Sequence, residues 1–130
     1  MPKVLSGIDG IKAAYQQALN EAKLDVICLS TEYQRVLGSY FEDMVEPKLH
    51  GGQLTLREIL PRNSTSVVEK DEMRRFLSAT QPSESDLLIG EKLVVIISFN
   101  PHSPSAVVLE DEELINGFQT YFDNLWNLAQ

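Results

Sequence analysis

The feature that most constrains this fold is the segment Leu24 to Leu29, a short run that is apolar on both of its faces. It follows directly on Ile8 to Lys23, whose apolar residues recur at helical spacing. A strand apolar on both faces belongs in a sheet that is covered on both sides, as in proteins that alternate helices with strands. The opening of the chain therefore predicts a helix, a buried strand and a layered α/β arrangement.

Two further segments show helical periodicity. The first begins after the capping residue Thr31, Pro47 is expected to end or kink it, and the pair Gly51-Gly52 is expected to close it. Its apolar stripe is Tyr33, Val36, Leu37, Tyr40, Phe41, Met44 and Val45. The second runs from Leu114 to Ala129, and acidic residues at its start favour the positive end of a helix dipole.

The remaining periodic segments predict strands. Gln53 to Leu60 alternates apolar and polar residues, and Arg74 to Ser78 is expected to be a short strand after a short helix at Ser66 to Glu72. The runs Leu87–Ile89 and Leu93–Phe99 flank a turn containing glycine, which predicts a hairpin, and Ala106 to Leu109 is a last strand. Together these elements predict one α/β domain over residues 1–130, a layered mixed β-sheet flanked by helices.

Composition limits the partners and the compartment. The chain has 130 residues, 43% of them hydrophobic, and a formal net charge of −8. Its eleven Lys and Arg are scattered, so a phosphate backbone would be repelled and direct nucleic-acid binding by this segment is not expected. A single cysteine, no apolar stretch of membrane-spanning length and no signal peptide favour a cytoplasmic protein without a membrane partner.

Residues that usually carry catalytic chemistry are sparse. His50 and His102 lie far apart in loops, where surface positions are expected rather than metal ligands, and Gly51-Gly52 lacks the Lys-Ser/Thr of a phosphate loop. Cys28 falls inside the buried run and is expected to be a core residue rather than a nucleophile. No metal and no cofactor are predicted.

The last helix has an unusually wide apolar face. If this face exceeds what the sheet covers, the excess marks a subunit interface. The residues proposed for that interface are Phe118, Tyr121, Phe122, Leu125 and Trp126.

The segment from Ser85 to Asn100 resembles the signature region of phospholipase D, in which a His-x-Lys-x4-Asp motif runs into a strand and ends in Ser-x-Asn. The tail Phe118-x3-Phe122-Asp123-x-Leu125-Trp126 resembles the terminal helix of the effector domain in TrmB-type transcriptional regulators. The resemblance covers nearly the whole chain and implies a phospholipase-D-like half. It also implies a homodimer, because catalytic members of the family place two such halves face to face.

The departure from the catalytic pattern is informative. With Lys92 and Ser98-x-Asn100 as anchors, the motif's His, Lys and Asp fall on Ser83, Ser85 and Gly90, and no histidine lies between positions 51 and 101. Phosphodiester transfer in that family needs an imidazole nucleophile and a cation for the phosphate. We therefore expect no enzymatic activity of this type.

The resemblance favours a regulatory module that dimerises or binds a small-molecule effector and is coupled to transcription. An effector pocket at the former catalytic cleft would be lined by Ser83, Ser85, Lys92, Ser98 and Asn100, with Arg57 or Arg74 as anion contacts. Two alternatives stay open: an interaction domain without a ligand, and an enzyme of another class built around Cys28. The sequence leaves open the effector, the strand order and whether a DNA-binding domain is fused to this one.

Overall fold

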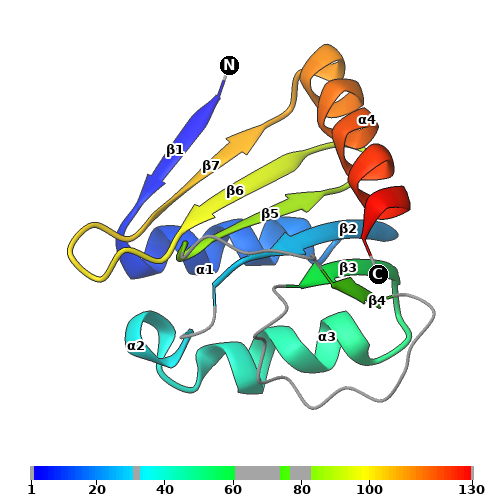
Figure 1. The fold of residues 1–130 in the computed structure, drawn as a ribbon. Helices are drawn as coiled ribbons and strands as arrows, with labels where there is room; N and C mark the ends of the chain where they lie inside the picture. The colour runs from blue at the N-terminus through cyan, green and yellow to red at the C-terminus, as the bar shows by residue number, and fades with distance from the viewer. Residues whose placement is uncertain (1, 31–32, 61–73, 77–82, 130) are drawn as a thin grey trace.

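The structure, a computed structural model, describes residues 2–30, 33–60, 74–76 (backbone only) and 83–129. Within these residues, seven strands form one sheet in the order β1-β7-β6-β5-β2-β3-β4 (Figure 1). The strands are β1 (Lys3–Ser6), β2 (Lys23–Cys28), β3 (Thr55–Leu60), β4 (Arg74–Phe76), β5 (Ser85–Ile89), β6 (Val94–Ser98) and β7 (Ser105–Leu109). The helices are α1 (Gly7–Ala18), α2 (Gln34–Leu37), the π-helical turn η1 (Phe41–Val45), α3 (Glu46–His50) and α4 (Glu112–Leu128).

The sheet is mixed, which confirms the predicted fold class. β2, β3 and β4 run parallel to one another, and the other neighbouring strands are antiparallel. The predicted hairpin is present, because β5 and β6 pair across the turn from Ser85↔Ser98 to Ile89↔Val94. β2 lies at the change of direction, with β5 antiparallel on one side and β3 parallel on the other.

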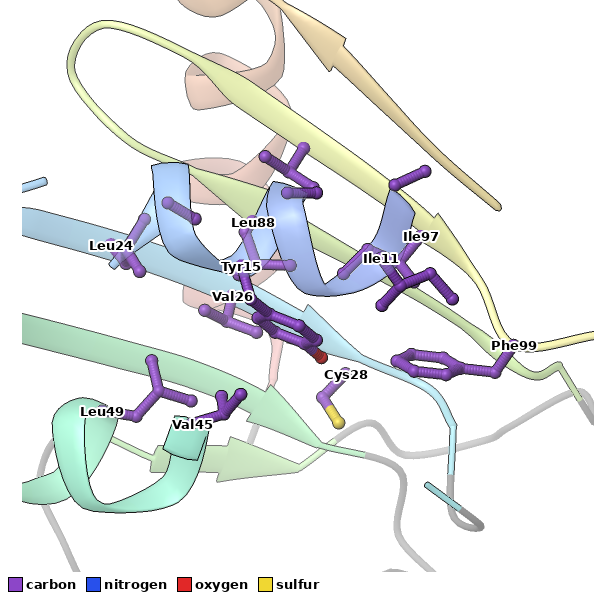
Figure 2. Packing of buried hydrophobic residues seen from close by; sticks show 14 of the residues in the cluster. Ile11, Tyr15, Leu24, Val26, Cys28, Val45, Leu49, Leu88, Ile97 and Phe99 are labelled. Atoms are coloured by element: carbon purple, nitrogen blue, oxygen red, sulfur yellow. The ribbon is translucent and has the colours of Figure 1, made fainter. Parts of the chain in front are cut away.

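Helices cover the two faces of the sheet to different extents. On one face, called here the α1 face, α1 and the segment from α2 to α3 enclose the larger apolar cluster, in which Ile11, Tyr15 and Val45 are fully buried (Figure 2). On the other, the α4 face, α4 encloses a smaller cluster that includes Phe122 and Trp126. The prediction of a layered sheet flanked by helices is therefore confirmed, and within the described residues α4 is the one helix on the α4 face.

The first helix is shorter than predicted and a strand precedes it. α1 ends at Ala18 rather than Lys23, which already begins β2. β1 was not predicted, because its four residues are joined to α1 without a loop. Gly7 permits this direct turn with a φ of +76°, and its N–H donates to the carbonyl of Pro104. Gly10 then lets α1 approach the backbone of β1, since a Cβ at Gly10 would lie 2.4 Å from the carbonyl carbon of Leu5.

The segment predicted as one long second helix is divided into three pieces. Gly38, with a φ of +58°, ends α2 after one turn, and the Glu46 N–H donates to the Phe41 carbonyl in a π-helical bond. The helix is interrupted at the predicted position, because η1 ends at Val45 and Pro47 lies in the first turn of the new helix α3, where its missing N–H costs nothing. The predicted cap Thr31 and the predicted helix at 66–72 lie outside the described residues.

Candidate functional site

Four serines lie side by side on four neighbouring strands of the sheet. The pairing register places Ser85 opposite Ser98, Ser98 opposite Ser105, and Ser105 opposite Ser6. Residues directly opposite one another in a sheet share a face. By strand alternation this serine row shares the α4 face with Ile96 and Val107. Two of the predicted site residues, Ser85 and Ser98, are therefore neighbours at one end of the serine row.

Around the serine row, the α4 face is poorly covered. On β6 and β7, every residue pointing to the α1 face is buried, and Val95, Ile97 and Val108 have no exposed surface. The residues of these two strands that point to the α4 face are only half-buried from Ile96 onward, namely Ile96, Ser98, Ser105, Val107 and Leu109. The end residue Val94 is the exception, because it lies in the cluster under α4.

We call this uncovered region the open face. On β1 its residue Val4 is 68% exposed. Its members are the serine row with Val4 and Val107, and Leu87 and Ile96 form its boundary, where they pack against the cluster under α4.

The predicted pocket residues divide between two ends of the sheet. Ser83 lies beside Ser85, with their hydroxyl oxygens 2.7 Å apart. Asn100 follows β6 at the same end, where its N–H donates to Ser98 and its side-chain oxygen accepts from the N–H of His102. Lys92 lies in the β5–β6 turn at the opposite end, about 13 Å away at 3.3 Å per strand residue. Its backbone N–H donates to Glu21, so Lys92 does not join the serines.

Arg57, predicted as an anion contact, is occupied within the chain. Its guanidinium donates two hydrogen bonds of 2.8 Å to Asp25, which lies opposite it in the β2–β3 register, and one of 3.0 Å to Asp123 of α4. It also lies over the rings of Phe122 and Trp126. Arg74 lies on the edge strand β4, and its side chain is outside the described part of the chain.

The residues proposed for a dimer interface have different exposures. Phe122 and Trp126 are buried between α4 and the sheet. Phe118 and Leu125 are half-buried and pack against the apolar cluster that these two residues belong to. Only Tyr121, which is 70% exposed, points away from the sheet. The width of the apolar stripe on α4 is therefore explained mainly by burial within one chain.

The α1 face carries a polar cluster that was not predicted from the sequence. Asp86, at the start of β5, is only 4% exposed, and its carboxylate accepts hydrogen bonds from the Ser30 hydroxyl (2.7 Å), the Ser30 N–H (3.2 Å) and the Tyr33 hydroxyl (2.8 Å). Cys28 hydrogen-bonds the Tyr33 hydroxyl and the Ser30 carbonyl. Burial raises the pKa of Asp86 to about 6, although these hydrogen bonds act in the opposite direction. The signal for this cluster in the sequence was the acidic residue Asp86 directly before the apolar run Leu87–Ile89.

A small cavity with a volume of about 20 Å³ lies next to Asp86. Its lining residues come from α1, the sheet and the segment from Tyr33 to α3, and they are Tyr15, Val26, Cys28, Tyr33, Phe41, Leu49, Glu58, Asp86 and Leu88. Glu58 is 6% exposed and lies 2.7 Å from His50, whose other ring nitrogen lies 2.7 Å from Glu46. Figure 2 shows Tyr15 and Cys28 in this part of the core.

Cys28 lacks the surroundings of a reactive thiol. Burial is the main reason that its pKa lies well above the usual value, and the charge of Asp86 raises it further. Reactive cysteines are usually accessible and have a lowered pKa. The thiol therefore fits the predicted core role better than the alternative nucleophilic role.

Comparisons with known proteins find similarity at the level of structure. No protein-family model matches the sequence, and no curated protein matches it. Among solved structures, a phospholipase D family member, Nuc from Salmonella typhimurium, superposes with a TM-score of 0.63 at 16% identity, over 100% of this chain and 97% of that one. NucT from Helicobacter pylori superposes with a TM-score of 0.67 at 8% identity, over 99% and 97%.

The third similar structure is TrmBL2, an archaeal chromatin protein described with a novel mode of DNA binding. It superposes with a TM-score of 0.63 at 13% identity. The match covers 99% of this chain but only 53% of TrmBL2, so the chain spans about half the length of that protein. No helix in the described residues is long and apolar enough to cross a membrane. The chain has a phospholipase-D-like fold of the kind also present in a TrmB-type protein.

Proposed function

We propose that this chain is a non-catalytic regulatory domain that dimerises through its open face and senses a small-molecule effector there. The observation that carries the proposal is the difference in cover between the two faces of the sheet. Strands β6 and β7 are fully buried on the α1 face, whereas Ile96 and Val107 are only half-buried on the other and Val4 is largely exposed. An apolar sheet face without its second layer is a natural contact for a second copy.

The serine row supports an effector site at that contact. In this register Ser85 and Ser98 occupy positions of the phospholipase D signature, and the side chains of a second copy would enclose them. Hydroxyl groups without a neighbouring imidazole can bind a polar ligand but cannot supply the nucleophile for phosphodiester transfer. This chemistry favours binding over catalysis.

An interaction domain without a ligand is the main alternative. It would use the same open face, but the hydroxyls of the serine row would contact the partner instead of an effector. An enzyme built around Cys28 is less well supported, because the thiol is buried and its pKa is raised.

Sedimentation equilibrium over a concentration series tests the dimer. We expect a dimer for the natural chain. Val107→Lys should weaken dimerisation at least about tenfold, because the new ammonium group would lose water in the interface. Met44→Lys is the matched control: Met44 is 50% exposed but lies on η1, on the other side of the sheet. A monomeric natural chain, or equal weakening by both substitutions, would contradict the proposal.

The effector is tested separately by thermal unfolding of the dimer with phosphorylated sugars and nucleotides. A ligand that binds the folded state raises the melting temperature. We expect the rise to disappear in Ser98→Val, which removes a hydroxyl from the row but keeps a strand-forming residue. A dimer whose melting temperature no compound raises favours the interaction domain without a ligand.

A further inference from the structure

The cavity beside Asp86 combines acidic and aromatic groups. Two buried carboxylates line it, Asp86 from β5 and Glu58 from β3. Tyr15, Tyr33 and Phe41 supply its aromatic wall: the rings of Tyr33 and Phe41 stack at 4.1 Å, and that of Tyr15 meets Phe41 edge-on at 6.1 Å. Carboxylates and aromatic faces both attract cations.

Glu58 is paired with His50 at 2.7 Å, whereas the described residues that line the cavity around Asp86 include no lysine or arginine. The direct hydrogen-bond donors to Asp86 among the described residues, Ser30 and Tyr33, are neutral. A buried carboxylate is usually paired with a cation, because leaving it unpaired in the interior is costly. The site therefore has the charge of a cation site.

A second and independent observation is the hydroxyl of Tyr15. This side chain is 1% exposed and lines the cavity, and within the described part of the chain its hydroxyl has no hydrogen-bond partner. Buried hydroxyls nearly always have one. A guest in the cavity would complete the hydrogen bonding of Tyr15.

The volume of the cavity limits the size of the ligand that it can hold. A volume of about 20 Å³ accommodates one particle of about the size of water. A quaternary ammonium group is too large, whereas the ammonium ion and the –NH₃⁺ end of a primary amine have suitable dimensions. An ammonium group can also donate several hydrogen bonds at once, to carboxylates and to a phenol oxygen.

We propose that the cavity between Tyr15, Glu58 and Asp86 binds the ammonium group of a small primary amine or the ammonium ion itself. The Asp86 carboxylate balances the charge, the Tyr15 hydroxyl oxygen accepts one N–H, and the rings of Tyr33 and Phe41 form the wall. This wall belongs to the segment from Tyr33 to α3, whose π-helical turn is of a type often found at functional sites. The cavity lies on the α1 face, so the proposal does not depend on dimerisation through the open face.

Thermal unfolding of the full chain at neutral pH tests the proposal, with ammonium chloride compared with sodium chloride and tetramethylammonium chloride at equal ionic strength. We expect ammonium to raise the melting temperature by about 5 °C over sodium at saturation. Ethylammonium should act in the same direction, and tetramethylammonium should have no effect. An equal rise with tetramethylammonium, or none with ammonium, would overturn the proposal, and the latter result would mean that the cavity holds only water.

Variants assign the effect to the cavity. Asp86→Asn and Tyr15→Phe should each abolish the ammonium-specific rise, whereas Asp43→Asn, an exposed carboxylate on η1, should keep it. If Asp86→Asn does not fold, Tyr15→Phe alone decides, because it keeps the ring and removes only the unpartnered hydroxyl. A rise of natural size in Tyr15→Phe would contradict the assignment.

A second measurement does not depend on stability. ¹⁵N-labelled ammonium held away from water should give a resonance separate from that of the free ion, and this resonance should be absent for Tyr15→Phe. A natural chain that gives only the free-ion resonance at saturating concentrations would refute the site. Because Val107→Lys lies on the opposite face, it should leave the bound resonance unchanged even if dimerisation is lost.

Discussion

Asp86 and Asp25 are buried carboxylates in one sheet with opposite electrostatic surroundings. Burial raises the pKa of Asp86 to about 6, and the hydrogen bonds from the neutral donors Ser30 and Tyr33 lower it only in part. Burial alone would also raise the pKa of Asp25, but hydrogen bonds from Arg57 and Gln119 outweigh it and the pKa is lowered. Asp25 therefore favours folding while it is charged, and Asp86 does so while it is protonated.

The raised pKa of Asp86 leads to a prediction of how stability depends on pH. Because its folded pKa lies above the ordinary value of 3.8, its contribution is fully present below about pH 4 and is lost as the pH rises through 6. Asp86→Asn removes the free-energy cost of burying a charged carboxylate, which the natural chain bears at neutral pH. The free energy of unfolding of the variant, relative to the natural chain, should therefore rise by about 2 kcal/mol from pH 4 to pH 7.

Urea unfolding of both proteins in sodium buffers free of amines measures this difference. Asp111→Asn, which changes an exposed helix cap, serves as the control and should show no such increase between pH 4 and pH 7. A constant difference between Asp86→Asn and the natural chain would contradict the assigned surroundings of Asp86.

The sequence predicted which polar residues gather at the site better than it predicted the contacts that each of them makes. Ser83, Ser85, Ser98 and Asn100 do gather at one end of β5 and β6, since a hairpin fixes which residues of its two strands meet. The partner of Arg57 was missed, because its proximity to Asp25 depends on the register of two parallel strands that are far apart in sequence. Ser6 was missed because it meets Ser105 across two antiparallel strands that are far apart in sequence, whereas Ser105 was missed although it faces Ser98 on the preceding strand.

Helix α4 is attached to the sheet by apolar burial and by one charged cluster. Phe122 and Trp126 pack on the sheet, and Arg57 lies over both rings at 4.9 and 5.2 Å. The same guanidinium connects Asp25 in β2 with Asp123 in α4. Arg57 therefore joins two strands and a helix and is a structural residue.

Arg57→Met should destabilise the chain by about 3 kcal/mol, because it leaves the buried carboxylate of Asp25 with only the more distant Lys23, at 3.7 Å, as a cation. Asp123→Asn removes only the exposed side of the cluster and should cost less than about 1 kcal/mol. Urea unfolding at neutral pH measures both changes. Equal losses for the two variants would mean that Asp25 is not the partner that makes Arg57 important.

Local periodicity identified most of the elements but not their boundaries. The stripe from Tyr33 to Val45 fits one helix, yet Gly38 and Pro47 divide it into three pieces. Both residues were visible in the sequence. The π-helical register between them was not, because it depends on how Phe41 and Val45 pack against the core.

At the scale of the whole molecule, three layers were predictable and strand order was not. Strands that are apolar on both faces require two covering layers, whereas parallel and antiparallel pairings fit the same pattern. The order β1-β7-β6-β5-β2-β3-β4 leaves α4 at one end of its face and exposes the open face beside it. The proposed second copy would complete that layer.

The most direct test of this dimer is an intermolecular distance measured between spin labels on the serine row. Ser105→Cys in a Cys28→Ala background places one label in the serine row of the open face. In a symmetric dimer formed through this face, the two labels should lie at a single short distance, because packed sheets are separated by only about 10 Å. A dimer whose labels are far apart, or a chain that shows no intermolecular coupling at any concentration, would contradict dimerisation through the open face.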